Sequence, residues 1–361
     1  MTAPLLIASC GAVTAVGLTA EQTCAAMRAR VAGFEASMYL PPPARPVTVA
    51  RVPAAQRLKL QPSRWLLSMA ELALRDCLGG FAARPGRIAL VLSVPDPHRQ
   101  HAALRSLTAT GLLDSLQQRL QMRFHPLSCV TDEGHAAVIK GFALARQILA
   151  GGEVDLCVVG GVDSLVNGDD VERLQRADRL HGETNPQGVI PGEGAGFVGL
   201  SMRGSATGTG PLAQILGIGI ALERDTILGE RFSTGVGLRE ALENAVRDAR
   251  CSEPDFSFRS SDANGERYRA WESLLCATRF YRSPRVQMPM WSVAASVGDV
   301  GAAAGALAVI AAAMGISRGY APGRYAMCEA SSDNGLRAAC ALASAPGAPA
   351  PPFRSRAALL Q

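Results

Sequence analysis

The sequence predicts an α/β fold built from two similar halves. An apolar strand pattern starts at Leu5, and a second one starts at Ala213 after a polar, glycine-rich stretch over residues 203–210. Helical spacing follows each of these strands, so strands and helices alternate twice along the chain. With 361 residues, of which 48% are hydrophobic and 19% charged, the chain can bury a large core. We predict an N-terminal half over 1–205, a C-terminal half over 206–345 and a Pro/Ala-rich tail over 346–361.

The first half opens with a strand over residues 5–13 that runs into a glycine turn. Thr19-Ala20-Glu21-Gln22 then has the spacing of a capping box, in which two side chains satisfy backbone amides at the start of a helix. The apolar residues of 66–77 and of 138–149 recur at helical intervals, which predicts two amphipathic helices. Residues 87–94 form a short apolar run that is typical of a buried strand.

The second half repeats this order. Residues 213–220 predict a strand, and the apolar positions of 238–249 predict the helix that follows it. Residues 325–331 and 336–343 are predicted to be strands joined by Asp333-Asn334-Gly335. An Asn-Gly pair between two apolar runs is a strong signal for a tight hairpin, because both residues tolerate a positive φ.

Composition and charge narrow the function classes. The net charge of +5 is modest and the 36 basic residues are scattered, which argues against nucleic acid and leaves acidic partners. Nine cysteines without CxxC pairs indicate reduced thiols in a cytoplasmic protein rather than a metal site. The longest apolar segment, 300–316, is shorter than the roughly 20 residues of a membrane span and predicts a buried central helix. No cofactor and no export signal are expected.

Four segments, taken in order, resemble one known family. Residues 5–19 are similar to the opening strand and turn of the β-ketoacyl-ACP synthases, and 151–163 and 185–196 are similar to a later strand and its proline- and glycine-rich loop. Residues 301–307 match the glycine/alanine helix that follows the family's second catalytic histidine. The resemblance implies a thiolase-like fold up to about residue 345, with two pseudo-two-fold related βαβαβαββ halves in five layers (α-β-α-β-α).

The resemblance also implies that the catalytic residues are replaced. In this family a cysteine at a helix N-terminus takes the acyl group, and two histidines stabilise the enolate formed by decarboxylation. Alignment backward from the first-half helix places His135, within one residue, at the cysteine position. Alignment on the glycine/alanine helix places Asp299 at one histidine position and Ala294 at the position of an active-site lysine. Asp262 lies near the other histidine position.

These substitutions predict a loss of condensation. An aspartate near pH 7 would repel both the malonyl carboxylate and the enolate. At about 4 Å and an effective dielectric near 20, one such repulsion costs about 4 kcal/mol, nearly a thousandfold in rate. The Gly-Phe-Gly-Gly gate loop of the family is also replaced, by Asp333-Asn334-Gly335. The alternative nucleophile is Cys129, six residues before His135, on the preceding strand or turn, which would need a rearranged loop to reach the pocket.

Each substituted residue also has a structural interpretation. Asp299 directly precedes an apolar helix, so its simplest role is that of an N-cap, and Asp132 has the same relation to the helix that starts near residue 137. His135 in the first helical turn is compatible with a hydrogen-bonded core or rim histidine. Glu266 begins a charged segment that predicts either a solvated cluster or local ion pairs with Arg267, Arg269 and Glu272.

A sharper alternative brings three of these residues together. His135, Asp262 and Asp299 would converge in the former catalytic pocket, where one imidazolium between two carboxylates forms a structural ion pair. The same three residues are a permissible metal ligand set, but they come from an alignment rather than from a local motif, so no metal is expected.

Two function classes remain open at this point. The first, which we favour, is a non-catalytic ketosynthase-like protein that serves dimerisation or partner docking, as chain-length factors do beside their catalytic partners. The altered segments 134–137, 265–272 and 298–301 also resemble small bacterial thiolase-like proteins encoded beside type VI secretion effectors. Expected partners are therefore a second copy, a ketosynthase-like subunit, an acyl carrier protein or a secretion effector. The second class is an acyltransferase on acyl-ACP or acyl-CoA thioesters that uses Cys129 as nucleophile or His135 as general base.

Overall fold

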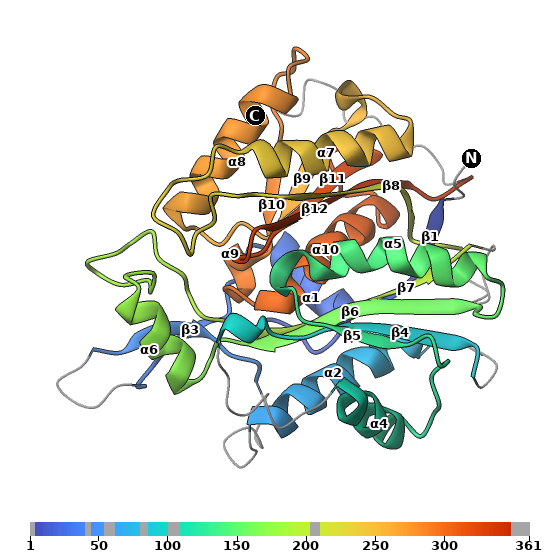
Figure 1. Cartoon of the computed structure of the whole chain (residues 1–361), viewed down its shortest axis with the longest axis horizontal. Helices are drawn as coiled ribbons and strands as arrows, with labels where there is room; N and C mark the ends of the chain where they lie inside the picture. Colours follow the sequence, from blue (N-terminus) through green and yellow to red (C-terminus); the bar gives the residue numbers. More distant parts are fainter. Residues whose placement is uncertain are drawn as a thin grey trace.

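A computed structural model describes residues 4–39, 45–53, 62–79, 86–99, 109–202 and 210–347. One sheet of ten strands runs through it (Figure 1). The strands of its first half are β1 (Leu5–Val13), β4 (Ile88–Ser93), β5 (Cys129–Thr131), β6 (Leu156–Ser164) and β7 (Glu193–Ser201). The strands of its second half are β8 (Ala213–Leu222), β9 (Phe258–Ser261), β10 (Met290–Ser292), β11 (Tyr325–Ser331) and β12 (Leu336–Ser344).

The strand order repeats between the two halves. The full order is β10-β9-β11-β12-β8-β1-β7-β6-β4-β5. Outward from β1, two antiparallel pairings, β1 with β7 and β7 with β6, are followed by two parallel ones. Outward from β8 the sequence of antiparallel and parallel pairings is the same. The short antiparallel pairing of Leu5–Ile7 with Ala213–Ile215 connects the halves. The predicted pseudo-two-fold α/β architecture is confirmed.

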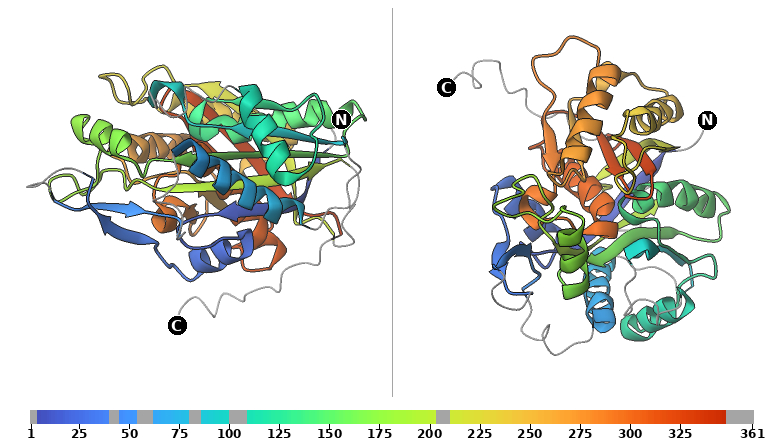
Figure 2. Two further views of the ribbon diagram at one scale, coloured as in Figure 1. Left: turned by 90° about the horizontal axis from the view of Figure 1, so that it is seen from below. Right: turned by 60° about the vertical axis from the view of Figure 1, so that its left-hand side comes forward.

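Helices form three layers around and between the two halves of the sheet (Figures 1 and 2). They are α2 (Pro62–Leu78), α4 (Ala109–Leu120), α5 (Ala137–Ala150), α7 (Val236–Ala249), α8 (Arg267–Phe280) and α10 (Ala304–Ser317). The α2 and α4 helices cover the outside of the first half, while α7 and α8 cover the second. Because α5 contacts both β6 and β12, and α10 contacts both β11 and β7, these two helices lie between the halves. The predicted five layers are confirmed.

Shorter elements complete the described structure. They are α1 (Ala20–Arg28), β2 (Phe34–Ser37), β3 (Val47–Ala50), η2 (Pro97–Arg99), η3 (Gly134–Ala136), α6 (Gly168–Arg176), η4 (Glu253–Asp255), α9 (Ala294–Val297) and η5 (Gly301–Ala303), where η marks a 3-10 helix. The α1 helix packs on α10 and β1, and β2 pairs with β3. The 3-10 helices η3 and η5 immediately precede α5 and α10 and contact each other in the middle layer.

The middle layer consists of apolar residues, and the backbone of η5 lies close against the strand β6. Every residue from Ala304 to Gly315 is buried, so α10 has no solvent face and the predicted central helix is confirmed. A Cβ atom on Gly161 of β6 would lie 2.1 Å from the carbonyl oxygen of Ala302. Only glycine therefore lets η5 contact the strand.

The predicted capping box at the start of α1 forms in part. The Thr19 hydroxyl accepts a hydrogen bond from the Gln22 amide at 3.2 Å. The Gln22 side chain, however, accepts from the Leu18 amide rather than from Thr19, so the reciprocal half of the predicted capping box is displaced by one residue. The expected linker and tail lie largely outside the described residues, at 203–209 and 348–361. None of the described helices is long and apolar enough to cross a bilayer.

Candidate functional site

The candidate site lies where the first turns of the two central helices meet. His135 is the middle residue of η3, which follows β5 and leads directly into α5. Gly134 before it adopts a φ of +74°, a conformation that glycine adopts without strain. The hydroxyl of Ser332, in the loop between β11 and β12, accepts a hydrogen bond from the Ala136 amide at 2.9 Å. The hairpin thus caps the start of α5, a role that the sequence suggested for Asp132.

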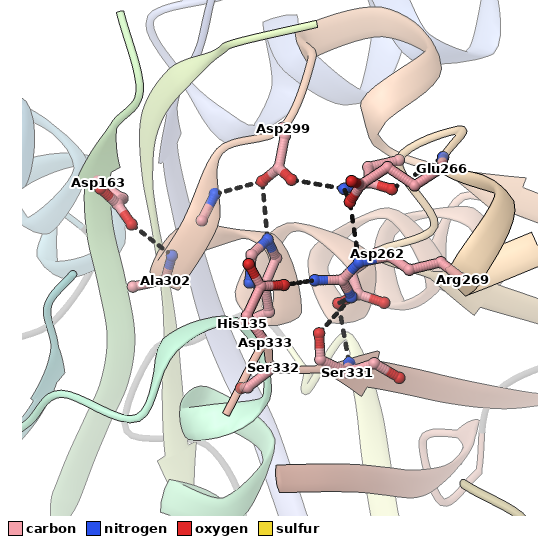
Figure 3. Close-up of polar contacts among 12 residues, drawn as sticks. His135, Asp163, Asp262, Glu266, Arg269, Asp299, Ala302, Ser331, Ser332 and Asp333 are labelled. Carbon is pink, nitrogen blue, oxygen red and sulfur yellow. Dashed lines mark hydrogen bonds and ion pairs between the residues drawn. The ribbon is translucent and has the colours of Figure 1, made fainter. Parts of the chain in front are cut away.

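The centre of the site is an ion pair between His135 and Asp299. The His135 Nε2 atom lies 2.7 Å from Asp299 Oδ1, and both side chains are almost fully buried (Figure 3). The same Oδ1 accepts a hydrogen bond from the Gly301 amide at 2.9 Å. The other carboxylate oxygen, Oδ2, accepts one from the Asn264 side-chain amide at 2.7 Å. Asp299 therefore caps η5, close to the expected helix-capping role, and at the same time pairs with the histidine.

A ring of buried charges surrounds this pair. Arg179 binds Glu266 at 2.6 Å and Asp333 at 2.9 Å. Arg269 binds Asp333 at 3.0 Å and Asp262 at 3.1 Å (Figure 3). Together with Asp299 these residues place four carboxylates against two guanidinium groups. A protonated His135 is the third cation of the cluster.

The electrostatics of the cluster favour this protonated state. Burial alone would lower the pKa of His135, but the facing Asp299 carboxylate raises it above the ordinary 6.5, against a smaller opposing effect of Arg269. Burial would raise the pKa of the Asp299 carboxyl, yet His135 and Arg269 hold it well below its usual range. Burial raises the pKa of Asp262, with Arg269 acting in the opposite direction. Both shifts favour an imidazolium at His135 beside an ionised Asp299 carboxylate.

The charge of His135 should make stability depend on pH. Because its folded pKa lies above 6.5, its contribution is fully present below the unfolded pKa and is lost as pH rises through the folded pKa. As pH rises from 6.5 through the folded pKa of His135, we expect the urea midpoint of the wild-type protein to fall. The midpoint of His135→Gln should fall by less, because glutamine has no charge to lose. Urea unfolding at a series of pH values measures both proteins. Parallel pH profiles would show that His135 is uncharged in the fold.

Asp262 and Ala294, the other two positions aligned with catalytic residues, are not part of the His135 and Asp299 ion pair. Asp262 follows β9 and its carboxylate accepts a hydrogen bond from the Ser331 amide at 2.9 Å, with Arg269 as its ion partner. Among the described residues it forms no hydrogen bond or ion pair with His135, although the charge of each group shifts the pKa of the other. His135 thus has one carboxylate in direct contact, Asp299, and a second one farther away. Ala294 is the first residue of α9 and is buried. Within the described part of the chain, no group of three metal-binding side chains comes together.

Two sequence-based interpretations, the Asp132 cap and the solvated charge cluster, are wrong. Asp132 is exposed, and neither η3 nor α5 receives a side-chain cap from the residue that precedes it. Glu266 is buried and pairs with Arg179, so it is not part of a solvated cluster. It does form one of the expected local ion pairs, with Arg269 at 3.8 Å. Glu272 is also buried, at 2.9 Å from Arg337. In the expected cluster only Arg267 is exposed.

A cavity of about 350 Å³ opens beside His135. Its walls carry polar side chains from both halves of the fold, namely Asp96, His98, Arg99, His135, Asp163, Arg173, Arg179 and Asp333. Among the described residues, no cysteine, serine or threonine lines it. Cys129 lies outside this lining, at the start of β5, and burial raises the pKa of its thiol. A raised pKa reduces the thiolate fraction on which nucleophilic attack depends.

The residues that sequence reasoning missed are the long-range partners. Arg179 lies 87 positions from Glu266 and 154 from Asp333. Arg99 binds Asp163 at 2.5 Å and Asp170 at 2.7 Å, and the same Asp163 accepts from the Ala302 amide in η5. No local spacing connects such residues. The sequence around Arg99 and Arg179 is polar and carries no signal that either arginine forms an ion pair inside the fold.

Comparison with known proteins finds similarity in solved structures. No model of a protein family and no curated protein matches the chain. It is similar to the ishigamide ketosynthase/chain length factor, with a TM-score of 0.77 and 18% identity over 95% of this chain and 100% of the other. It is also similar to the ketosynthase ApeO in complex with its chain length factor ApeC from Xenorhabdus doucetiae (TM-score 0.76, 16% identity, 95% and 98% covered).

A third similar structure is AntDE:AntF, a type II PKS acyl-carrier protein in complex with its ketosynthase bound to the hexaketide. Its TM-score is 0.79 at 13% identity, with 95% of this chain and 100% of the other covered. Likeness at these identities establishes architecture rather than activity. The chain has the thiolase-like fold shared by ketosynthases and chain length factors.

Proposed function

We propose that this chain is a ketosynthase-like protein that does not condense acyl groups and that serves as a dimerisation or partner-docking scaffold. The observation that carries the proposal is the buried His135 and Asp299 ion pair at the junction of the two central helices. Sequence resemblance places both residues where condensing enzymes of this fold hold a nucleophile and a histidine. Here the two side chains are bound to each other.

This arrangement opposes the chemistry of condensation. A protonated imidazole whose Nε2 faces a carboxylate has no lone pair with which to accept a proton. The four carboxylates of the cluster would repel a malonyl group and an enolate, whereas condensation needs donors aimed at the developing negative charge. The cluster therefore supports a structural role, in which buried and mutually bound charges fix the junction of the two halves.

The same observations count against the acyltransferase alternative. Cys129 lies outside the cavity lining and has a thiol with a raised pKa. His135 is held as an imidazolium and would have to lose its proton before it could act as a general base. Among the described residues, no cysteine, serine or threonine lines the cavity beside His135 for it to activate.

The fold and the net charge of the chain indicate what kind of partner it binds. We propose that the chain pairs with a second copy or with a ketosynthase-like subunit, as the solved structures pair a ketosynthase with a chain length factor. The β5 strand ends the described sheet on the side of the first half and is the proposed site of pairing. A net charge of +5 suits an acidic client, either an acyl carrier protein or, from the sequence resemblance, a type VI secretion effector. The boundary between halves at residues 205 and 206 is part of this proposal.

Light scattering of the purified protein tests the assembly. At micromolar concentration we expect a mass of twice the 37.7 kDa of one chain, because thiolase-type proteins that this chain resembles assemble by sheet-edge pairing. A mass of one chain, both alone and in a mixture with a ketosynthase-like subunit encoded nearby, would contradict the scaffold proposal. A dimer that forms only in the mixture identifies the heteromeric form.

A further inference from the structure

A second cavity lies beside the central helix α10. It has a volume of about 560 Å³ and is enclosed by α1, β10, α9 and α10, which lie close together in Figure 1. It shares no lining residue with the cavity beside His135. Cavities that hold small organic ligands in proteins span about 300–1,000 Å³. This one is large enough for such a ligand, and the proposed scaffold role makes no use of it.

The rim of the second cavity is basic. Arg28 ends α1, and Arg30 follows two residues later with a left-handed φ of 57°. The Arg28 guanidinium lies 4.7 Å from the centroid of the Tyr320 ring. Neither arginine forms an ion pair with any residue that the structure describes, and the described lining of the cavity includes no aspartate or glutamate. Two guanidinium groups therefore face the cavity without a protein counter-ion.

The floor is aromatic and apolar. The rings of Trp291 and Tyr320 stack with centroids 6.1 Å apart and an angle of 23° between their planes. Cys24 and Ala311 complete the apolar surface, and burial raises the pKa of the Cys24 thiol to about 12, so it acts as a small apolar side chain. A flat apolar group can lie against this floor.

One polar group stands in the floor without a partner. Ser296 lines the cavity, its hydroxyl makes no hydrogen bond to any described residue, and the hydroxyl oxygen is open to the solvent in the cavity. A ligand in the cavity can therefore take the place of water as the acceptor of a hydrogen bond from Ser296.

We propose that this cavity binds a small organic anion. Its flat apolar body lies on Trp291 and Tyr320, its carboxylate or sulfonate is bound by Arg28 and Arg30, and a polar atom accepts from the Ser296 hydroxyl. The arginines supply charge-assisted hydrogen bonds at the rim, while the aromatic floor supplies contact area. The site goes beyond the scaffold role and does not depend on it.

Titration with anilinonaphthalene sulfonate, followed by its fluorescence, tests the proposal. This probe joins an aromatic body to one anionic group, and phenylnaphthylamine is its uncharged counterpart. We expect one saturable site for the anion, with energy transfer from tryptophan that is reduced in Trp291→Phe. The double variant Arg28→Ala, Arg30→Gly should bind at least about tenfold more weakly, and Ser296→Ala should weaken binding by a smaller factor. Glycine is used at position 30 because it accepts the positive φ without strain.

The matched control is the double variant Arg247→Ala, Arg250→Gly. Arg247 lies in the last turn of α7, and Arg250 has a φ of 53°, so the control removes the same two charges from the same local geometry outside the cavity. It should bind the probe as the wild-type protein does. Unchanged affinity in the Arg28 and Arg30 variant, or equally tight binding of phenylnaphthylamine, would overturn the proposal. Unfolding midpoints of all variants exclude a general loss of structure as the cause.

Discussion

Arg269→Met is expected to lower the free energy of unfolding by about 3–5 kcal/mol, the usual cost of removing one partner from a buried ion pair. Arg269 is 5% exposed and holds Asp262 and Asp333 at 3.1 and 3.0 Å. It also donates to the Ser331 carbonyl. Methionine fills a similar volume but leaves the buried Asp262 carboxylate without its ion partner, while Asp333 keeps only Arg179. Urea unfolding, with the midpoint and slope compared between variants, measures the loss.

The control for this variant is Arg176→Met. Arg176 pairs with Glu172 one helical turn away, and both side chains are at least half exposed. Exposed pairs of this kind contribute less than about 1 kcal/mol, so the control should unfold close to the wild-type midpoint. Equal losses in the two variants would mean that the charges around His135 are solvated in the folded protein.

Gly161→Ala is expected to destabilise the fold by about 3 kcal/mol or more, at the upper end of the cost of overpacking a core. The added methyl group would lie 2.1 Å from the Ala302 carbonyl oxygen, a backbone atom that cannot move without shifting η5. Since η5 carries the Gly301 amide that binds Asp299, the same change should disturb the site. A thermal scan records the loss as a lower midpoint.

Gly168→Ala provides the comparison. Gly168 is the first residue of α6, and a Cβ atom there would meet nothing within 4 Å. Alanine at an open position with an ordinary φ stabilises a protein by about 0.4–1 kcal/mol, because it restricts the unfolded chain. The two glycine variants should therefore move the midpoint in opposite directions. A Gly161→Ala protein as stable as the wild type would show that η5 does not pack against β6.

The longer elements could be predicted because their patterns are strong. The segment 300–316 is apolar on every side, and it became the buried central helix. The Asp333-Asn334-Gly335 turn joins two apolar runs, and β11 and β12 are paired as expected. The strands β5 and β10 have three residues each, which is too few to show a period in sequence. The β2 and β3 strands were missed for the same reason.

The candidate site was predictable only in its local part. Asp299 before an apolar helix predicted an N-cap. The N-cap residue is Val300, and Asp299, one residue earlier, binds the Gly301 amide. Its partner His135 is 164 positions away, and family resemblance alone put the two residues in one pocket. Glu266 and Glu272 look solvated in sequence because their partners, Arg179 and Arg337, are 87 and 65 positions distant. Charge in a sequence does not reveal burial when the counter-ion is remote.

Decarboxylation of malonyl-ACP by the purified protein tests the central claim, that the fold is retained without condensing chemistry. Release of carbon dioxide is followed beside a protein-free control, and intact mass is read after incubation with acyl-ACP and acyl-CoA donors. We expect no release above the control and no acyl adduct, because His135 is bound to Asp299 and no described thiol lines the cavity beside it. A stable adduct on Cys129, or turnover that Cys129→Ala or His135→Ala removes, would contradict the account and establish an acyltransferase.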